Sequence, residues 1–232
     1  GETTLVSVAD PATTLDGVES EIAVENGDSL IVTKDWAPEK DRLTVTLDTD
    51  ATLAVSGLSD SATLTVGVGK SFAVNAAEDG EGNVAEPNVA VFDEIVNNGN
   101  FSLGNVAANA ASWTDAEDAT LTITGTKTDT EERLASLDIS GAADGTTTFN
   151  SAVALTNGAL AVAQGNVVLN GAVVSENGTV DVEAGDLTAN NTVSLTDSTV
   201  TADGDVALNG AISSKNGAIT ATTGSLTVSG GA

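Results

Sequence analysis

Apolar and polar residues alternate along most of this chain, and from residue 146 onward the alternation repeats about every twenty residues. Lines that begin at residues 146, 166, 186, 205 and 225 align with one another, and the third line is one residue shorter. The apolar columns of these lines are Val167, Leu187 and Val206; Leu169, Ala189 and Leu208; and Val180, Val200 and Ile219. Because alternate side chains of a strand share one face, the pattern predicts short strands with a common core.

A strand of four or five residues cannot bury its apolar face alone, but stacked copies of such strands can. Twenty residues suit a coil of two or three short strands with turns between them. We therefore expect an all-β protein, a right-handed parallel β-helix (solenoid) with coils of about 20 residues. The sequence divides into repeats over 96–232 and a less regular β segment over 1–95, which is interpreted as early coils, a cap or a small β-domain.

The polar columns predict how the corners of the coils are built. Asn-Gly pairs mark candidate corners, because both residue types tolerate positive φ; they lie at 26–27, 98–99, 157–158, 170–171, 177–178, 209–210 and 216–217. Stacked amides can hydrogen-bond from coil to coil and satisfy groups that a corner would leave unpaired. The predicted ladder residues are Asn150, Asn170, Asn190 and Asn209 in one column and Asn157, Asn177 and Asn216 in another.

Composition narrows the range of partners. The chain is 41% hydrophobic but only 3% aromatic, and its formal charge is −27 with seven basic residues. Such a charge argues against binding to nucleic acids or to anionic membranes, because no cationic patch is present to meet phosphates. No run approaches the roughly 20 apolar residues of a membrane span, so we expect no membrane insertion of this segment. The sequence starts at Gly1 and stops eight residues into a repeat, as expected of a processed chain or a part of a longer one.

Candidate chemistry is sparse. The chain has no His, Cys or Tyr, which excludes a Ser-His-Asp triad, a Cys nucleophile and a His-ligated metal. The acidic residues lie mostly in predicted loops, where nothing tunes their pKa for catalysis, so we expect no enzyme activity and no cofactor. One acidic loop offers hard oxygen ligands that suit Ca²⁺, at Asp79, Glu81 and Asn83, although it lacks the EF-hand spacing.

The repeat NGAVVSENGTVDVEAGDLTANNTVSLTDSTVTADGDVALNGAIS (170–213) resembles the passenger repeats of bacterial autotransporters and filamentous-haemagglutinin-like exoproteins. The resemblance is one of pattern and composition, and it covers about 119–232, with a looser match over 89–118. It implies a right-handed parallel β-helix that is exported to the bacterial cell surface or secreted. It also implies that the protein functions as an adhesin, a matrix fibre or a display stalk.

We therefore expect a structural or adhesive protein. One version of this hypothesis is that copies of the chain assemble through exposed coil edges. Its partners would be other copies of itself, or glycans or proteins of a host or cell surface. Loops on a rigid scaffold usually carry binding residues, so we place partner contacts on the irregular segments 35–42, 76–88 and 126–133. An S-layer or other cell-envelope lattice protein is the alternative, and a polysaccharide lyase or hydrolase is a further one.

Overall fold

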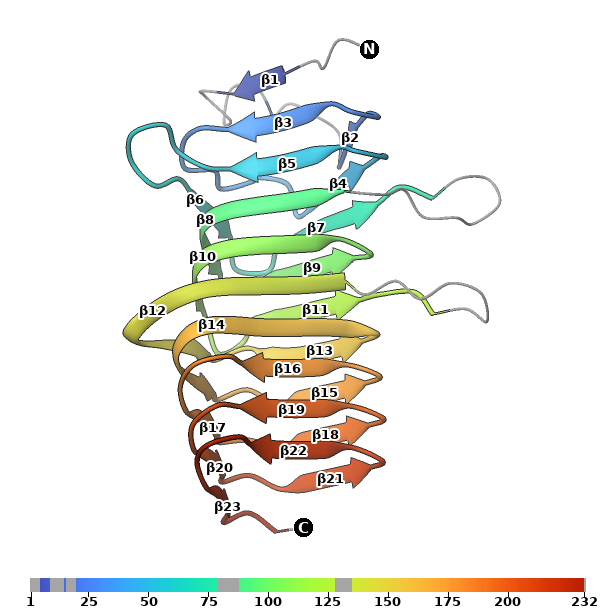
Figure 1. Ribbon diagram of the computed structural model, residues 1–232. Coiled ribbons are helices and arrows are strands. Elements are labelled where there is room, and N and C mark those ends of the chain that lie inside the picture. Colours follow the sequence, from blue (N-terminus) through green and yellow to red (C-terminus); the bar gives the residue numbers. More distant parts are fainter. Residues whose placement is uncertain (1–4, 9–14, 16–19, 79–87, 128–134, 232) are drawn as a thin grey trace.

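The computed structural model describes residues 5–8, 15, 20–78, 88–127 and 135–231. These residues form an all-β structure, with no helix among them, that consists of two long parallel sheets. The sheets stack strand upon strand from the N-terminal end to the C-terminal end of the molecule (Figure 1). Strands from successive parts of the sequence therefore become neighbours in space.

The first sheet has nine strands and is called the nine-stranded sheet below. Its strands, in their order across the sheet, are β2 (Glu21–Val24), β4 (Arg42–Leu47), β7 (Ser71–Ala76), β9 (Asn100–Gly104), β11 (Thr120–Thr124), β13 (Ala152–Thr156), β15 (Val173–Glu176), β18 (Val193–Thr196) and β21 (Ile212–Lys215).

The second sheet has fourteen strands and turns a corner, because several of its strands are long enough to bend. Its main path is β1 (Leu5–Val8), β3 (Ser29–Val32), β5 (Thr52–Val55), β8 (Val89–Asn97), β10 (Ala107–Asp115), β12 (Ala135–Phe149), β14 (Gly158–Leu169), β16 (Thr179–Val182), β19 (Thr199–Ala202) and β22 (Ala218–Ala221). Beside this path lie β6 (Thr63–Val66), β17 (Leu187–Ala189), β20 (Val206–Leu208) and β23 (Leu226–Val228).

Strand pairing follows the sequence repeat. Leu187 of β17 pairs with Val167 on one side and Val206 on the other, and both pairings are parallel. Strands before the regular repeat belong to the same two sheets: β8 spans residue 95, and it pairs in parallel with β5, β6 and β10. All of this is consistent with the parallel β-helix that the repeat predicts.

The apolar columns predicted from the repeat lie in the core. Val167, Leu187 and Val206 are each at most 1% exposed, and Val200 is 3% exposed. Ile219, in the same column as Val200, is only partly buried because it belongs to the last strands of the stack. The buried columns confirm that period-two alternation assigns the faces of these strands correctly.

The N-terminal part of the core contains every aromatic side chain of the protein. Ring centroids 5.4 to 6.1 Å apart connect them into one group, which comprises Trp36, Phe72, Phe92, Phe101, Trp113 and Phe149. All six are at most 4% exposed. Beyond Phe149 the buried hydrophobic side chains are those of Val, Leu and Ala. The aromatic group therefore distinguishes the early part of the stack from the regular later part.

Segment 35–42, which was expected to be an irregular charged loop, contains one residue that lies in the core. Trp36 is 1% exposed and forms an isolated parallel bridge with Leu64. The backbone N–H of Trp36 donates to the carbonyl of Thr63 at 2.8 Å, and its backbone carbonyl accepts the N–H of Thr65 at 2.9 Å. A short backbone contact of this kind gives no alternating pattern, so the sequence did not distinguish it from a loop.

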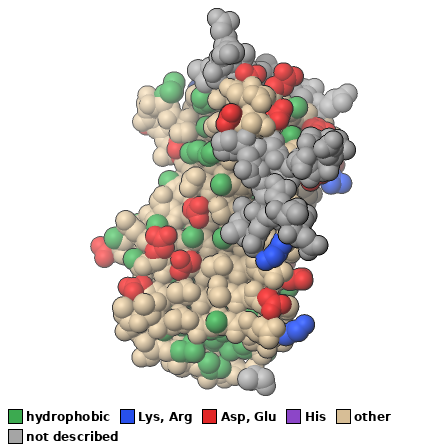
Figure 2. Space-filling view, turned by 45° about the vertical axis from the view of Figure 1, so that its right-hand side comes forward, with side chains coloured by type: hydrophobic (Ala, Val, Ile, Leu, Met, Phe, Trp, Pro, Cys, Tyr) green, Lys and Arg blue, Asp and Glu red, His purple; other side chains and the backbone are tan. Residues whose placement is uncertain are grey.

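The C-terminal end of the stack exposes apolar side chains. Leu226 is 48% and Val228 is 49% exposed, although both occupy columns that are buried in earlier coils. Figure 2 shows hydrophobic side chains at this end of the molecule. Among the described residues, β21, β22 and β23 each pair with a strand on one side only. Beside β21, the backbone N–H of Ile212 donates to the carbonyl of Gly231 at 3.1 Å.

Candidate functional site

The first predicted amide column forms an unbroken ladder. The Nδ2 of Asn170 donates to the Oδ1 of Asn150 at 2.8 Å, Asn190 donates likewise to Asn170 at 2.9 Å, and Asn209 donates to Asn190 at 2.8 Å. The Nδ2 of Asn150 donates to the backbone carbonyl of Asp115 at 3.1 Å. These exposed amides bond one coil to the next, which is a structural task.

The second predicted column lies at corners where the backbone turns. Asn157, Asn177 and Asn216 have positive φ, of 46°, 50° and 57°. Asn216 donates to the Oδ1 of Asp197 at 2.9 Å, and Asp197 itself has φ of 50°. Because Asn and Asp tolerate the left-handed region better than most residues, this column serves backbone geometry as well as hydrogen bonding.

A third ladder was not predicted from the sequence. The Oδ1 of Asn166 accepts the N–H of Asp186 at 2.9 Å, Asp186 accepts the N–H of Asp205 at 2.8 Å, and Asp205 accepts the N–H of Ser225 at 2.7 Å. These residues occupy the first position of successive lines, so the column was visible in the alignment. The two acidic members, Asp186 and Asp205, suggested solvated loops instead.

Asp115 fastens one coil to the next through its carboxylate. It accepts the N–H of Asn150 at 2.7 Å and the N–H of Ser151 at 3.0 Å, and the Ser151 hydroxyl also donates to it. Asp115 belongs to an acidic stretch with Glu117 and Asp118, whose sequence was interpreted as a solvated loop or a weak calcium site. Two backbone donors and a hydroxyl give this carboxylate a defined structural partner.

Asp93 has a similar arrangement at the loop between β5 and β6. Its Oδ2 accepts the N–H of Gly57 at 2.8 Å and the N–H of Ala62 at 3.0 Å, and its Oδ1 accepts the Ser56 hydroxyl at 2.9 Å. One carboxylate thus holds both ends of loop 57–61. The signal in the sequence is the consecutive polar pair Asp93-Glu94, which interrupts the alternation of β8 and gives two successive half-buried positions.

The hydrogen bonds of Asp93 predict a pH dependence of stability. Burial raises the pKa of Asp93, but the N–H groups of Ala62 and Gly57 and the Ser56 hydroxyl outweigh it and leave the pKa below its ordinary value. A carboxyl whose pKa is lower in the folded state stabilises the fold above the unfolded pKa of about 3.9, and this contribution is lost as pH falls through the folded pKa. Replacing Asp93 by Asn should therefore lower the melting temperature at neutral pH, and the difference from the native chain should shrink below about pH 4.

Thermal unfolding followed by circular dichroism from pH 7 to pH 3 measures this difference. Asp60→Asn is the matched control, because it removes the same charge from the exposed part of the same loop. A melting-temperature difference for Asp93→Asn that stays constant over the whole range would contradict the assignment.

The calcium candidates Asp79, Glu81 and Asn83 lie outside the described residues. Within the part of the chain that the structure describes, three or more His, Cys, Asp or Glu side chains nowhere converge as ligands for a metal ion. None of the described residues lies in a helix of the length and apolarity that a membrane span requires.

A hollow of about 540 Å³ lies next to the described ends of the two later irregular segments, 76–78 and 126–127. Its lining includes Asn75, Glu78, Asn105, Thr124 and Thr126. The Oδ1 of Asn105 is buried without a hydrogen-bond partner in the described structure. The lining is mostly polar, so the hollow can offer hydrogen bonds to a polar ligand, and Glu78 brings a carboxylate.

A second hollow, of about 610 Å³, lies beside loop 57–61. It is lined by Lys34, Asp35, Leu58 and Asp60, with neighbouring Ser and Thr residues. Leu58 is 87% exposed although Asp93 fastens both ends of its loop. The arrangement presents an apolar side chain from a held loop, which is a geometry suited to contact with a partner.

Comparison of the chain with protein-family models, with curated proteins and with solved structures finds no match in any of the three.

Proposed function

We propose that this chain is a right-handed parallel β-helix that serves as the stalk, adhesin or fibre subunit of a protein secreted by bacteria or displayed on their surface. The observation that carries the proposal is the register between successive coils. Parallel pairs step through the sequence by one repeat, as from Glu176 to Thr196 and from Thr196 to Lys215. A chain built in this way grows in length by adding coils and gives a rigid rod on which loops are displayed.

The side chains of the regular coils support a scaffold role. The Asn150 to Asn209 ladder, the Asn166 to Asp205 ladder and the buried apolar columns assign most positions of each coil to packing or to hydrogen bonds between coils. Partner contacts are therefore proposed at the irregular positions. These are the loop that presents Leu58 and the hollow lined by Asn105 and Glu78.

The proposed partners are other copies of the chain, or glycans or proteins of a host or cell surface. The outer edges of β22 and β23 suit a further coil, whether of this chain or of another copy. The proposed role is not enzymatic. It needs no cofactor, and nucleic acids are not expected as partners of a chain with a charge of −27.

Two measurements test the proposal. Electron microscopy of the purified chain should show rods or fibres, whereas regular two-dimensional sheets that need calcium would favour a cell-envelope lattice protein. Beads coated with the chain should adhere to cells or glycan-coated surfaces more than beads coated with a variant carrying Leu58→Ser and Glu78→Gln. Equal adhesion of both kinds of beads at background level would contradict the adhesive role, and release of sugar products from a polysaccharide would contradict the structural one.

A further inference from the structure

Across eight of its nine strands, the outer face of the nine-stranded sheet has an uncharged central column; it ends at β2, where the exposed Glu21 is in register with Thr44. Along eight described strands, from β4 to β21, the outward residue at the middle of each strand is uncharged; seven of these residues are small or hydroxylated, and Val174 is an apolar side chain that is 55% exposed. This column consists of Thr44, Ala73, Ser102, Thr122, Ala154, Val174, Ser194 and Ser213. Neither a carboxylate nor a basic group occurs at these described positions.

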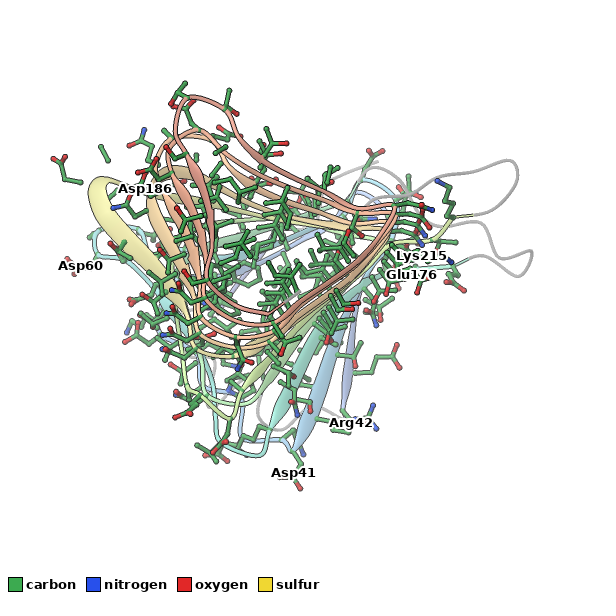
Figure 3. All side chains as sticks on the ribbon, turned by 90° about the horizontal axis from the view of Figure 1, so that it is seen from below. Asp41, Arg42, Asp60, Glu176, Asp186 and Lys215 are labelled. Carbon is green, nitrogen blue, oxygen red and sulfur yellow. The ribbon has the colours of Figure 1, made fainter. Side chains whose placement is uncertain are left out.

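Charged residues of these strands lie only at the edges of the face. The outward column at the start of these strands begins at Arg42. The outward column at the end of these strands contains Glu176 and Lys215. Figure 3 shows Arg42 at one corner of the molecule and Glu176 with Lys215 at another, with the sheet between them. With Glu21 of β2, the outward positions of the nine strands carry two positive and two negative groups and so have no net charge, in a chain whose formal charge is −27.

The outer surface of the fourteen-stranded sheet differs. Asp138 and Asp181 lie in one outward column of that sheet. Asp186 and Asp205 add carboxylates at the next corner. Two copies that approached through this surface would bring like charges together, which is unfavourable and reaches far at low salt.

The dimensions of the uncharged face suit a contact between two copies. Eight strands about 4.8 Å apart and five residues of about 3.3 Å each give a face of about 600 Å². Two such faces bury about 1,200 Å², the lower limit of specific protein interfaces. The small side chains permit a close, even approach, and hydrated hydroxyls of Ser102 and Thr122 can bond across it through water.

We propose that two copies of this chain pack side by side through the outer face of the nine-stranded sheet. The contact is separate from the free coil ends and does not rest on the adhesive role. It has no aromatic anchor at the described outward positions of β4 to β21, so the association is weak. The rest of the surface is acidic, so the association strengthens as salt screens repulsion, the opposite of a contact held by ion pairs.

Sedimentation velocity of the whole chain tests the proposal over a range of protein concentrations in about 0.01 M and about 1 M sodium chloride. The native chain should be monomeric at low salt and form dimers at high salt. A double variant, Ser102→Glu and Thr122→Glu, places carboxylates in the centre of the face and should remain monomeric at high salt. Thr188→Glu is the control for a carboxylate added outside this face, because Thr188 is a half-buried outward residue of β17 between uncharged Val168 and Ala207. The control should dimerise like the native chain.

Absence of dimers from the native chain at high salt would overturn the proposal, and so would equal dimerisation of the double variant. Loss of dimers in both the double variant and Thr188→Glu would mean a general charge effect and would also overturn it. If the double variant fails to fold by circular dichroism, cysteine placement replaces it, since the chain has no Cys. Thr122→Cys should then be joined by a bifunctional maleimide at high salt, whereas Thr188→Cys should not. Electron microscopy scores end-to-end fibres separately, so failure of the lateral contact is distinguishable from failure of the proposed function.

Discussion

Replacing Phe101 by Ala is expected to lower the free energy of unfolding by about 3 to 5 kcal/mol, the range measured when large aromatic side chains are removed from protein cores. Phe101 is 0% exposed and is the centre of the aromatic group. Its ring lies 6.1 Å from that of Phe72, 5.9 Å from that of Phe92 and 5.8 Å from that of Trp113, measured between centroids. The surrounding strands are held by parallel pairs on both sides of β9, so they cannot move in to fill the cavity.

Equilibrium unfolding in urea, followed by tryptophan fluorescence, measures this loss. Trp36 and Trp113 are the only tryptophans, and both belong to the group that Phe101 joins. Phe101→Leu is the graded control and should cost less, because it keeps most of the buried volume. Val174→Ala removes apolar atoms from a side chain that is 55% exposed and should change stability little. A loss below about 1 kcal/mol for Phe101→Ala would contradict a tightly packed aromatic core.

The periodic part of the fold was predictable because each coil repeats the same physical solution. Alternation identified the buried faces at Val167, Leu187 and Val206, and the asparagine column identified residues that bond from coil to coil. Both signals appear once per repeat. A single sequence is then sufficient, since each coil serves as a comparison for the others.

Features that occur once were harder to predict. Trp36 enters the core through a single bridge to Leu64, which leaves no alternating run around it. Asp93 was hidden inside a strand pattern, and Asp115 within an acidic stretch, because their hydrogen-bond partners lie more than thirty residues away. The uncharged central column from β4 to β21 also required the structure. The sequence contains Thr44, Ser102 and Thr122 at unrelated places, and only the register brings them into one column.

The Asn-Gly corners also have a feature that the sequence alone did not predict. Positive φ was expected to explain them, and it does so at Asn157, Asn177 and Asn216. At Gly171 and Gly210 the reason is close approach. A Cβ on Gly171 would lie 1.8 Å from the carbonyl oxygen of Ser151, and one on Gly210 would lie 2.1 Å from that of Asn191. Coil spacing therefore demands glycine here, and no dihedral preference of the residue itself reveals it.

Replacing Gly171 by Ala is accordingly expected to destabilise the chain by about 3 kcal/mol, at the upper end of the usual cost of overpacking. The atoms in the way are the carbonyl oxygen of Ser151, its carbon and the amide nitrogen of Ala152, and none of them can rotate aside as a side chain can. Gly231→Ala is the matched control, because a Cβ there would meet nothing within 4 Å. Restriction of the unfolded chain alone favours alanine by about 0.4 to 1 kcal/mol, so the control should be neutral or slightly stabilising. Thermal unfolding of both variants, followed by circular dichroism, separates the steric cost at Gly171 from the general effect of replacing Gly by Ala. Equal melting temperatures for the two variants would show that the corner at Gly171 can widen to admit a methyl group.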